Sequence, residues 1–140
     1  MRCLGIDYGR RRIGLALSDP TLFIASPLTI MENKGLKKNV TRLLEIIKQN
    51  EVGIIVVGLP LHANGDESEM SREARWFGQA FSDLGYQVEF VDERYTSCTA
   101  EEMIGNDPRR KNLIDKVAAS IILQMYLDER RSGKNEGGNN

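Results

Sequence analysis

The chain has 140 residues, of which 41% are hydrophobic and 28% are charged, and this composition is typical of one globular domain. Its two cysteines, Cys3 and Cys98, have neither CxxC spacing nor a framework of partners, which argues against a zinc site and against a disulfide-stabilised fold. No apolar stretch reaches the length of a membrane span, and the N-terminus lacks a secretory pattern. We therefore expect a cytoplasmic protein.

The net charge of −1 does not by itself suggest nucleic-acid binding. The basic residues are nevertheless clustered, in four groups: Arg10, Arg11 and Arg12; Lys34, Lys37 and Lys38; Arg109, Arg110 and Lys111; and Arg130, Arg131 and Lys134. A local patch, rather than the total charge, decides whether a surface binds phosphates. Short charged runs are usually solvated loops and helix ends, so this pattern taken alone favours that interpretation over a phosphate-binding surface.

The N-terminal part of the chain predicts three short strands joined by short links, which indicates an antiparallel meander. The strands are expected at residues 2–8, 13–18 and within 23–30. In the first strand, alternation places Asp7 on the face opposite to Leu4 and Ile6. In the second strand, bulky and small residues alternate, so one face carries large side chains and the other carries small ones. Pro27 interrupts the third strand and indicates a position at the sheet edge.

The rest of the chain alternates helices with strands. Helices are expected from Leu36 to about Ile47, from Glu69 to Leu84, from Thr96 or Ser97 to Met103 and from Leu113 to about Arg130, and strands at 54–57 and 88–91. Gly58, Pro60, Asn64 and Gly65 are expected in one loop, and 105–111 in a basic loop. We expect one domain over residues 1–131, followed by a disordered tail over 132–140. Strand–helix–strand units favour parallel pairing. The prediction is an α/β fold whose mixed five-stranded sheet, a three-strand antiparallel meander plus two parallel strands, is flanked by helices.

Three carboxylates occupy positions that folding alone does not explain. Asp7 follows an apolar strand, and Glu93 follows Phe90 and Val91 at the end of the last strand. If these strands run parallel, the two acids share the edge at which sites form in open α/β sheets. Asp115 heads a helical stripe of apolar and small residues, where a carboxylate is costly unless it is paired or bound to a metal. Taken alone, Asp115 fits equally well as an acid that stabilises the first turn of a helix.

Converging carboxylates without a convincing His or Cys partner suit a hard cation, Mg²⁺ or Mn²⁺. The one histidine, His62, falls in a loop and is interpreted as a surface residue. The acids would instead be structural if they formed salt bridges, for example Glu93 with Arg94. Three acids at one edge make that alternative the weaker one.

Several motifs together resemble the YqgF family of pre-16S rRNA nucleases and Holliday junction resolvases. They are Gly5-Ile6-Asp7-Tyr8-Gly9 with Ile13 to Asp19, Val57-Gly58-Leu59-Pro60-Leu61 with Asn64-Gly65, Asp92-Glu93-Arg94-Tyr95-Thr96-Ser97, and Asp115-Lys116-Val117-Ala118-Ala119 continuing to Leu127. They occur in order over about residues 1 to 128. The segment between Met103 and Leu113 looks shorter and less basic than is usual in the family, which concerns substrate binding more than chemistry.

The resemblance implies a ribonuclease H-like fold and assigns metal binding and catalysis to Asp7, Glu93 and Asp115. It implies maturation of the 5′ end of pre-16S ribosomal RNA, whereas the older family name implies cleavage of branched DNA. In either case one or two Mg²⁺ or Mn²⁺ ions would assist hydrolysis of a phosphodiester. The candidate phosphate contacts are Arg10, Arg11, Arg94, Arg109, Arg110 and Lys111. The role of Asp19, which matches a family position, is left open.

Two rival functions use the same fold. An ATP-binding phosphotransferase of the actin-like class begins with a similar Asp-Gly-Gly hairpin, but it normally needs two such domains to enclose the nucleotide. A non-catalytic RNA-binding module would keep the fold while Glu93 and Asp115 were dispensable.

Overall fold

The computed structural model describes residues 1–93 and 110–137, and the side chains of residues 1–93 and 117–133. The strands are β1 (Arg2–Tyr8), β2 (Arg12–Ser18), β3 (Ala25–Glu32), β4 (Val52–Leu59) and β5 (Gln87–Asp92), and the helices are α1 (Leu36–Gln49), α2 (Glu69–Asp83) and α4 (Arg110–Gly137). The helix expected at Thr96 or Ser97 to Met103 lies outside the described residues. Within them, no helix is both long and apolar enough to cross a bilayer.

The five strands form one mixed sheet in the order β3-β2-β1-β4-β5. The pairs β1–β2 and β2–β3 are antiparallel, while β1–β4 and β4–β5 are parallel. This confirms the expected meander with two parallel strands. β3 lies at the edge, and its register with β2 shifts where Ala16 faces Pro27, in keeping with the missing N–H of proline.

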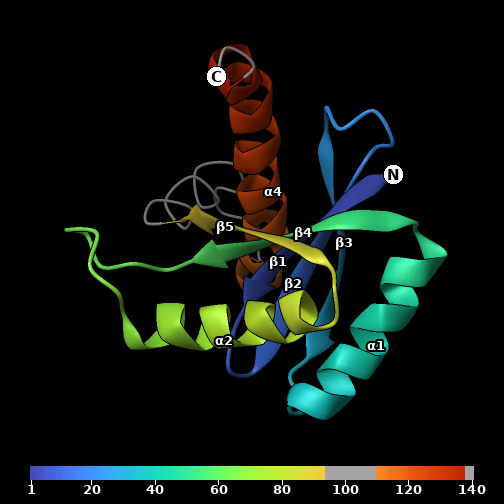
Figure 1. The fold of residues 1–140 in the computed structure, drawn as a ribbon. Helices are drawn as coiled ribbons and strands as arrows, with labels where there is room; N and C mark the ends of the chain where they lie inside the picture. The colour runs from blue at the N-terminus through green and yellow to red at the C-terminus, as the bar shows by residue number, and fades with distance from the viewer. Residues whose placement is uncertain (94–109, 138–140) are drawn as a thin grey trace.

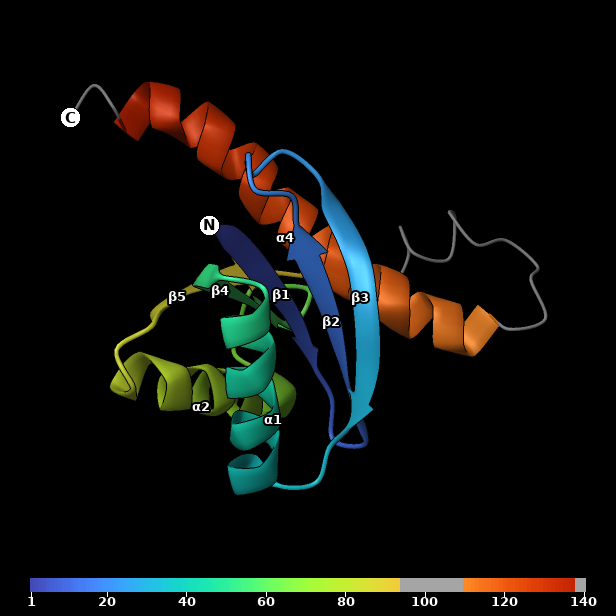
Figure 2. The same cartoon turned by 90° about the vertical axis from the view of Figure 1, so that its right-hand side faces the viewer.

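Helices cover both faces of the sheet, as Figures 1 and 2 show, with α1 and α2 on one face and α4 on the other. On the first face, Leu4 and Ile6 of β1 pack in one apolar cluster with Leu43 of α1 and Phe77 of α2. Cys3 belongs to the second cluster, which includes four buried residues of α4: Ala119, Ile122, Leu123 and Leu127. The alternation within β1 therefore divides two cores, as its sequence predicted.

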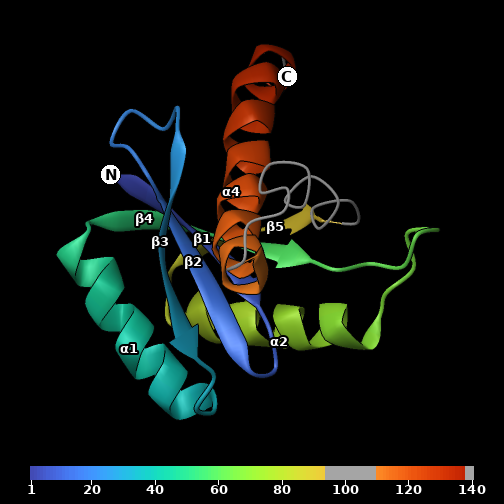
Figure 3. The same ribbon diagram turned by 180° about the vertical axis from the view of Figure 1, so that it is seen from behind.

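The small face of the sheet lets α4 approach closely. A Cβ added to Gly5 would lie 2.7 Å from the Cβ of Leu123 and 3.0 Å from the carbonyl oxygen of Ala119. Ala16, the register partner of Gly5 on β2, is fully buried on the same face. Residues without bulk are thus required where the helix crosses the central strands (Figure 3).

Three expected boundaries were wrong. Gly58 is part of β4, because the ladder to β5 continues through it and Leu59. Helix α4 begins at Arg110 rather than Leu113, since no Gly or Pro between them stops the helical hydrogen bonds, so Arg110 and Lys111 do not belong to a loop. α4 also extends to Gly137, because a single glycine such as Gly133 weakens a helix without ending it.

Candidate active site

The carboxyl ends of the three parallel strands meet at one edge of the sheet. Asp7 lies near the end of β1, and Glu93 immediately follows β5. The backbone N–H of Glu93 donates to the carbonyl of Leu59 at 3.1 Å, which continues the pairing with β4 past the end of β5. This bond fixes the residue that carries the carboxylate, so its position is set by the sheet and not by a loop.

Alternation places both acids on the α4 face. Asp7 is two residues after Gly5, which contacts Leu123 of α4. Glu93 is two residues after Val91, which belongs to the same buried cluster as α4. The strand period of two therefore directs residues 7 and 93 to the same face of the same edge.

The pKa of Glu93 reflects its burial and the negative charges of the neighbouring acids. Burial, followed by the negative charges of Asp7 and then Asp92, raises the pKa of Glu93 to about 8. Desolvation and a neighbouring like charge both disfavour the ionised carboxyl. The edge thus concentrates negative charge in a partly buried place, which a cation would stabilise.

Gly58 provides the space beside the carboxylate of Glu93. It lies on β4, the strand between β1 and β5, one residue after the partner of Ile6. A Cβ at this position would lie 3.0 Å from the carboxyl carbon of Glu93 and 2.6 Å from Cδ1 of Ile122. The sequence pattern had placed Gly58 in a loop, and the missed signal was a glycine that directly continues the apolar run of residues 54–57.

Asp115 lies in the N-terminal part of α4, and its side chain is outside the described residues. Its position precedes Ala119 by four residues and Ile122 by seven, so helical spacing puts it on the face of α4 that meets β1 and β4. Among the side chains that the structure describes, no group of three His, Cys, Asp or Glu residues is arranged to hold a metal. The structure therefore describes the side chains of two of the three predicted metal ligands, Asp7 and Glu93.

The turn after Asp7 forms a cleft of about 290 Å³, lined by Asp7, Gly9, Arg10, Arg11, Arg12 and Gly14. Gly9 has no room for a side chain, because an added Cβ would lie 2.5 Å from the carbonyl oxygen of Arg12. This tight turn brings arginine side chains close to a catalytic candidate. Such a cleft is suited to a phosphate group beside Asp7.

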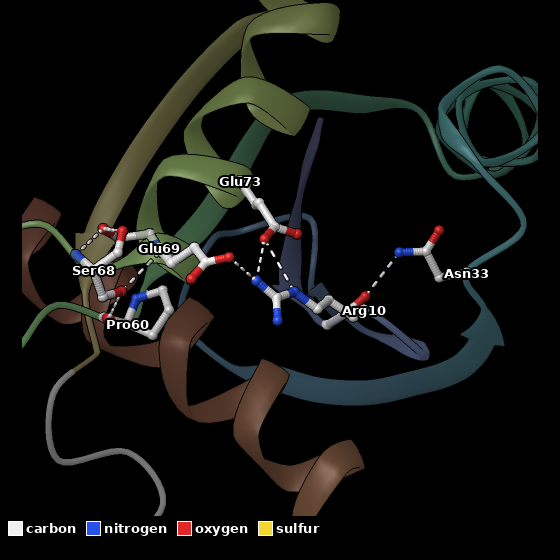
Figure 4. Close-up of polar contacts among 8 residues, drawn as sticks. Arg10, Asn33, Pro60, Ser68, Glu69 and Glu73 are labelled. Atoms are coloured by element: carbon white, nitrogen blue, oxygen red, sulfur yellow. Dashed lines mark hydrogen bonds and ion pairs between the residues drawn. The ribbon is translucent and has the colours of Figure 1, made fainter.

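The arginines of this turn are not equivalent. Arg10 forms ion pairs with Glu73 at 2.6 Å and with Glu69 at 2.7 Å, both on α2 (Figure 4). The hydrogen bond from Arg10 holds the pKa of Glu73 below its usual value, and the two acids compensate the charge of Arg10. Arg11 is exposed like Arg10 but forms no ion pair with another described side chain, which makes it the better candidate for a phosphate contact.

Arg94 and Arg109 lie outside the described residues, and Arg110 and Lys111 are located only by the backbone of α4.

Asp19 organises the loop between β2 and β3. Its carboxylate accepts hydrogen bonds from the backbone N–H groups of Phe23 and Ile24, each at 2.8 Å, and from both the N–H and the hydroxyl of Thr21. The bond from Ile24, followed by that from the Thr21 hydroxyl, holds the pKa of Asp19 well below its usual range. Asp19 therefore has a structural task in this loop, and His62 is an exposed residue of the loop that follows β4.

With this geometry established, known proteins provide the context. The family model described as RuvX, Holliday junction resolvase, matches residues 1–129. The chain belongs to the RuvX family. This confirms the resemblance drawn from the motifs, since RuvX and YqgF designate the same family.

Curated relatives in the RuvX family cover nearly the whole chain. A protein of Endomicrobium trichonymphae named "Putative pre-16S rRNA nuclease" is 44% identical over 133 residues, covering 91% of this chain and 95% of that protein. A protein of the same name from Syntrophomonas wolfei is 42% identical over 139 residues, covering 96% and 99% of the two chains.

Solved structures show that the ribonuclease H-like fold was correctly expected. RuvC of T. thermophilus in complex with a Holliday junction substrate has a TM-score of 0.61 at 18% identity, covering 94% of this chain and 96% of that chain. The fowlpox virus Holliday junction resolvase has a TM-score of 0.58 at 17% identity, with coverages of 92% and 99%. At such identities the likeness concerns the fold and not the substrate.

Proposed function

We propose that this protein is a cytoplasmic, metal-dependent nuclease that hydrolyses phosphodiester bonds and processes the 5′ end of pre-16S rRNA. The observation that carries the proposal is the proximity of Asp7 and Glu93 at the carboxyl edge of the sheet, beside an arginine-containing cleft. The names of the RuvX-family relatives support the choice of substrate. The domain that performs this function is residues 1–131.

The donor set fits a divalent cation. Asp7 and Glu93 offer carboxylate oxygens, the ligands that Mg²⁺ and Mn²⁺ prefer, and the raised pKa of Glu93 reports crowding of negative charge that a cation would relieve. We assign Asp115 as the third carboxylate. When bound, one or two such ions would lower the pKa of water and stabilise the charge on phosphate oxygens.

The protein's own groups would position the substrate. The β1 end and β5 end hold two carboxylates on the rigid sheet, which fixes the place of the scissile phosphate. Gly9 and Gly14 line the cleft without side-chain bulk, so a strand backbone can approach Asp7. Arg11 would hold a neighbouring phosphate, which positions the strand without selecting its sequence.

A purified protein with Mg²⁺ or Mn²⁺ should cleave a pre-16S rRNA fragment that spans the mature 5′ end. Asp7→Asn should abolish cleavage while circular dichroism and the melting temperature stay near those of the wild type. Asp83→Asn removes a charge from an exposed acid at the end of α2 and should cleave normally. Full activity of a folded Asp7→Asn protein would overturn the assignment.

A four-way DNA junction tests the second candidate substrate, which the description of the family model favours. Cleavage of the junction, with the rRNA fragment left intact, would assign the same carboxylates to junction resolution. Cleavage of the rRNA fragment alone at the mature end supports the proposed function.

A further inference from the structure

A second cleft, of about 350 Å³, lies between the end of β3 and the start of α1. Lys34, Lys38 and Arg42 line it together with one acid, Glu32. All three cations are exposed, and none forms an ion pair with another described side chain. The cleft therefore presents a net positive surface to solvent.

Helix stability does not account for the position of Lys38. The first turn of α1 contains no acid, and Lys37 and Lys38 occupy its second and third positions. Acids stabilise a helix there and cations oppose its dipole. A positive surface maintained against this local preference is a reason to look for an anionic ligand.

The cleft is held by the hydrogen bonds of a buried asparagine. Asn39 is only 1% exposed. Its Nδ2 donates to Oδ1 of Asn33 at 2.8 Å, and its Oδ1 accepts from the backbone N–H of Lys34 at 3.0 Å. The side chain of Asn39 thereby fixes the segment that carries Lys34 against the body of α1.

The same segment is connected to the turn beside Asp7. The Nδ2 of Asn33 donates to the carbonyl of Gly9 at 2.9 Å, and its backbone N–H donates to the carbonyl of Arg11 at 2.9 Å. One asparagine therefore joins the segment that carries Lys34 to the turn that lines the cleft containing Asp7. A long anionic ligand that starts at Asp7 and passes this turn would reach the positively charged cleft.

We propose that the cleft at Lys34, Lys38 and Arg42 binds the phosphate backbone of the substrate strand, beyond the phosphate that Asp7 and Glu93 address. The three residues are spaced by four along the chain, and Lys38 and Arg42 follow each other at about 6 Å along the axis of α1. A row of cations suits a polymer with regularly repeated charges better than a single small anion. This proposal rests on the proposed nuclease function and adds the path of the strand.

Binding, measured separately from cleavage, tests it. The triple variant Lys34→Gln/Lys38→Gln/Arg42→Gln is compared with Arg2→Gln/Lys48→Gln/Arg130→Gln, which removes the same charge from residues at the start of β1, the end of α1 and the distal half of α4. The probe is a fluorescein-labelled RNA hairpin with a single-stranded extension, in EDTA so that it stays intact. Anisotropy titrations are run at several salt concentrations.

The cleft variant should bind at least tenfold more weakly than the control at 100 mM KCl. Each lost phosphate contact lowers the slope of log affinity against log salt by about 0.7–0.9, so the cleft variant should lose about 2 in slope. Equal affinity and equal slope in the two variants would overturn the proposal. If the triple variant melts early, Lys34→Gln/Arg42→Gln is measured in its place.

The two proposals fail differently. If wild-type protein binds the probe through this cleft but cuts no RNA or DNA, the cleft assignment stands and the nuclease function falls. If wild-type protein cuts RNA and the cleft variant binds like the control, the cleft assignment falls alone.

Discussion

Gly58→Ala tests the geometry on which the candidate site depends. The added methyl would lie 2.6 Å from Cδ1 of Ile122 and 3.0 Å from the carboxyl carbon of Glu93. Ile122 is fully buried, so the clash is relieved only by rotation or displacement within a packed core. Overpacking of this kind costs about 1–2 kcal/mol, which in a domain of this size lowers the melting temperature by roughly 3–8 °C.

The same substitution should also reduce cleavage. Relief of the contact at 3.0 Å requires Glu93 to move by a few tenths of an ångström, and a misplacement of 1 Å can cost about a hundredfold in rate. We therefore expect a loss of roughly three- to tenfold in kcat, in addition to the loss of stability.

A second substitution separates the two effects. Ile122→Val removes the atom nearest to the new methyl but leaves the contact with Glu93. The double variant Gly58→Ala/Ile122→Val should lose less stability than the sum of the single variants, by about 0.5 kcal/mol or more. Its cleavage rate should stay as low as that of Gly58→Ala.

The assays are thermal melting by circular dichroism and single-turnover cleavage at saturating Mg²⁺. Gly133→Ala is the matched control, because an added Cβ there meets nothing within 4 Å, and replacing a helical glycine should stabilise by about 0.5–1 kcal/mol. Wild-type stability and activity of Gly58→Ala would refute the packing argument. Recovery of full activity in the double variant would refute the role given to Glu93.

Two further predictions concern pH. The pKa of Glu93 is raised from 4.5 to about 8 by burial and then by Asp7, so the metal-free fold loses stability as the pH rises between these two values. In urea titrations with EDTA, Glu93→Gln should therefore stabilise the protein more at pH 8.5 than at pH 5. An equal gain in stability at both pH values would contradict this. Hydrogen bonds from Ile24 and Thr21 depress the pKa of Asp19, so its stabilisation is complete above the unfolded value of 3.8 and declines below it. Asp19→Asn should thus lower the urea midpoint at pH 7 and have a smaller effect at pH 3, whereas a constant difference would show that the hydrogen bonds do not depend on charge.

The local sequence pattern determined which residues form strands and helices, and which face of the sheet each residue of a strand lies on. The alternation of Leu4 and Ile6 with Cys3 and Gly5 fixed which side of β1 meets which helix layer, because a strand directs successive side chains to opposite faces. Pro27 predicted the edge position of β3 for an equally local reason, the missing N–H. Chain order also placed Asp7 and Glu93 at strand ends, and parallel pairing followed from the strand–helix–strand order.

Only the tertiary structure determined which segments, distant along the chain, are in contact. The length of β4 depends on pairing with β5 through Gly58 and Leu59, and nothing within residues 52–59 encodes that partner. The ion pairs of Arg10 with α2 join residues about sixty positions apart, so a run of three arginines could not reveal which of them is compensated. Contacts between distant segments arise from the packing of the whole sheet. The sequence pattern could therefore identify Asp7 and Glu93 as candidate acids, but only the fold shows that they lie at one edge with Gly58 on the strand between them.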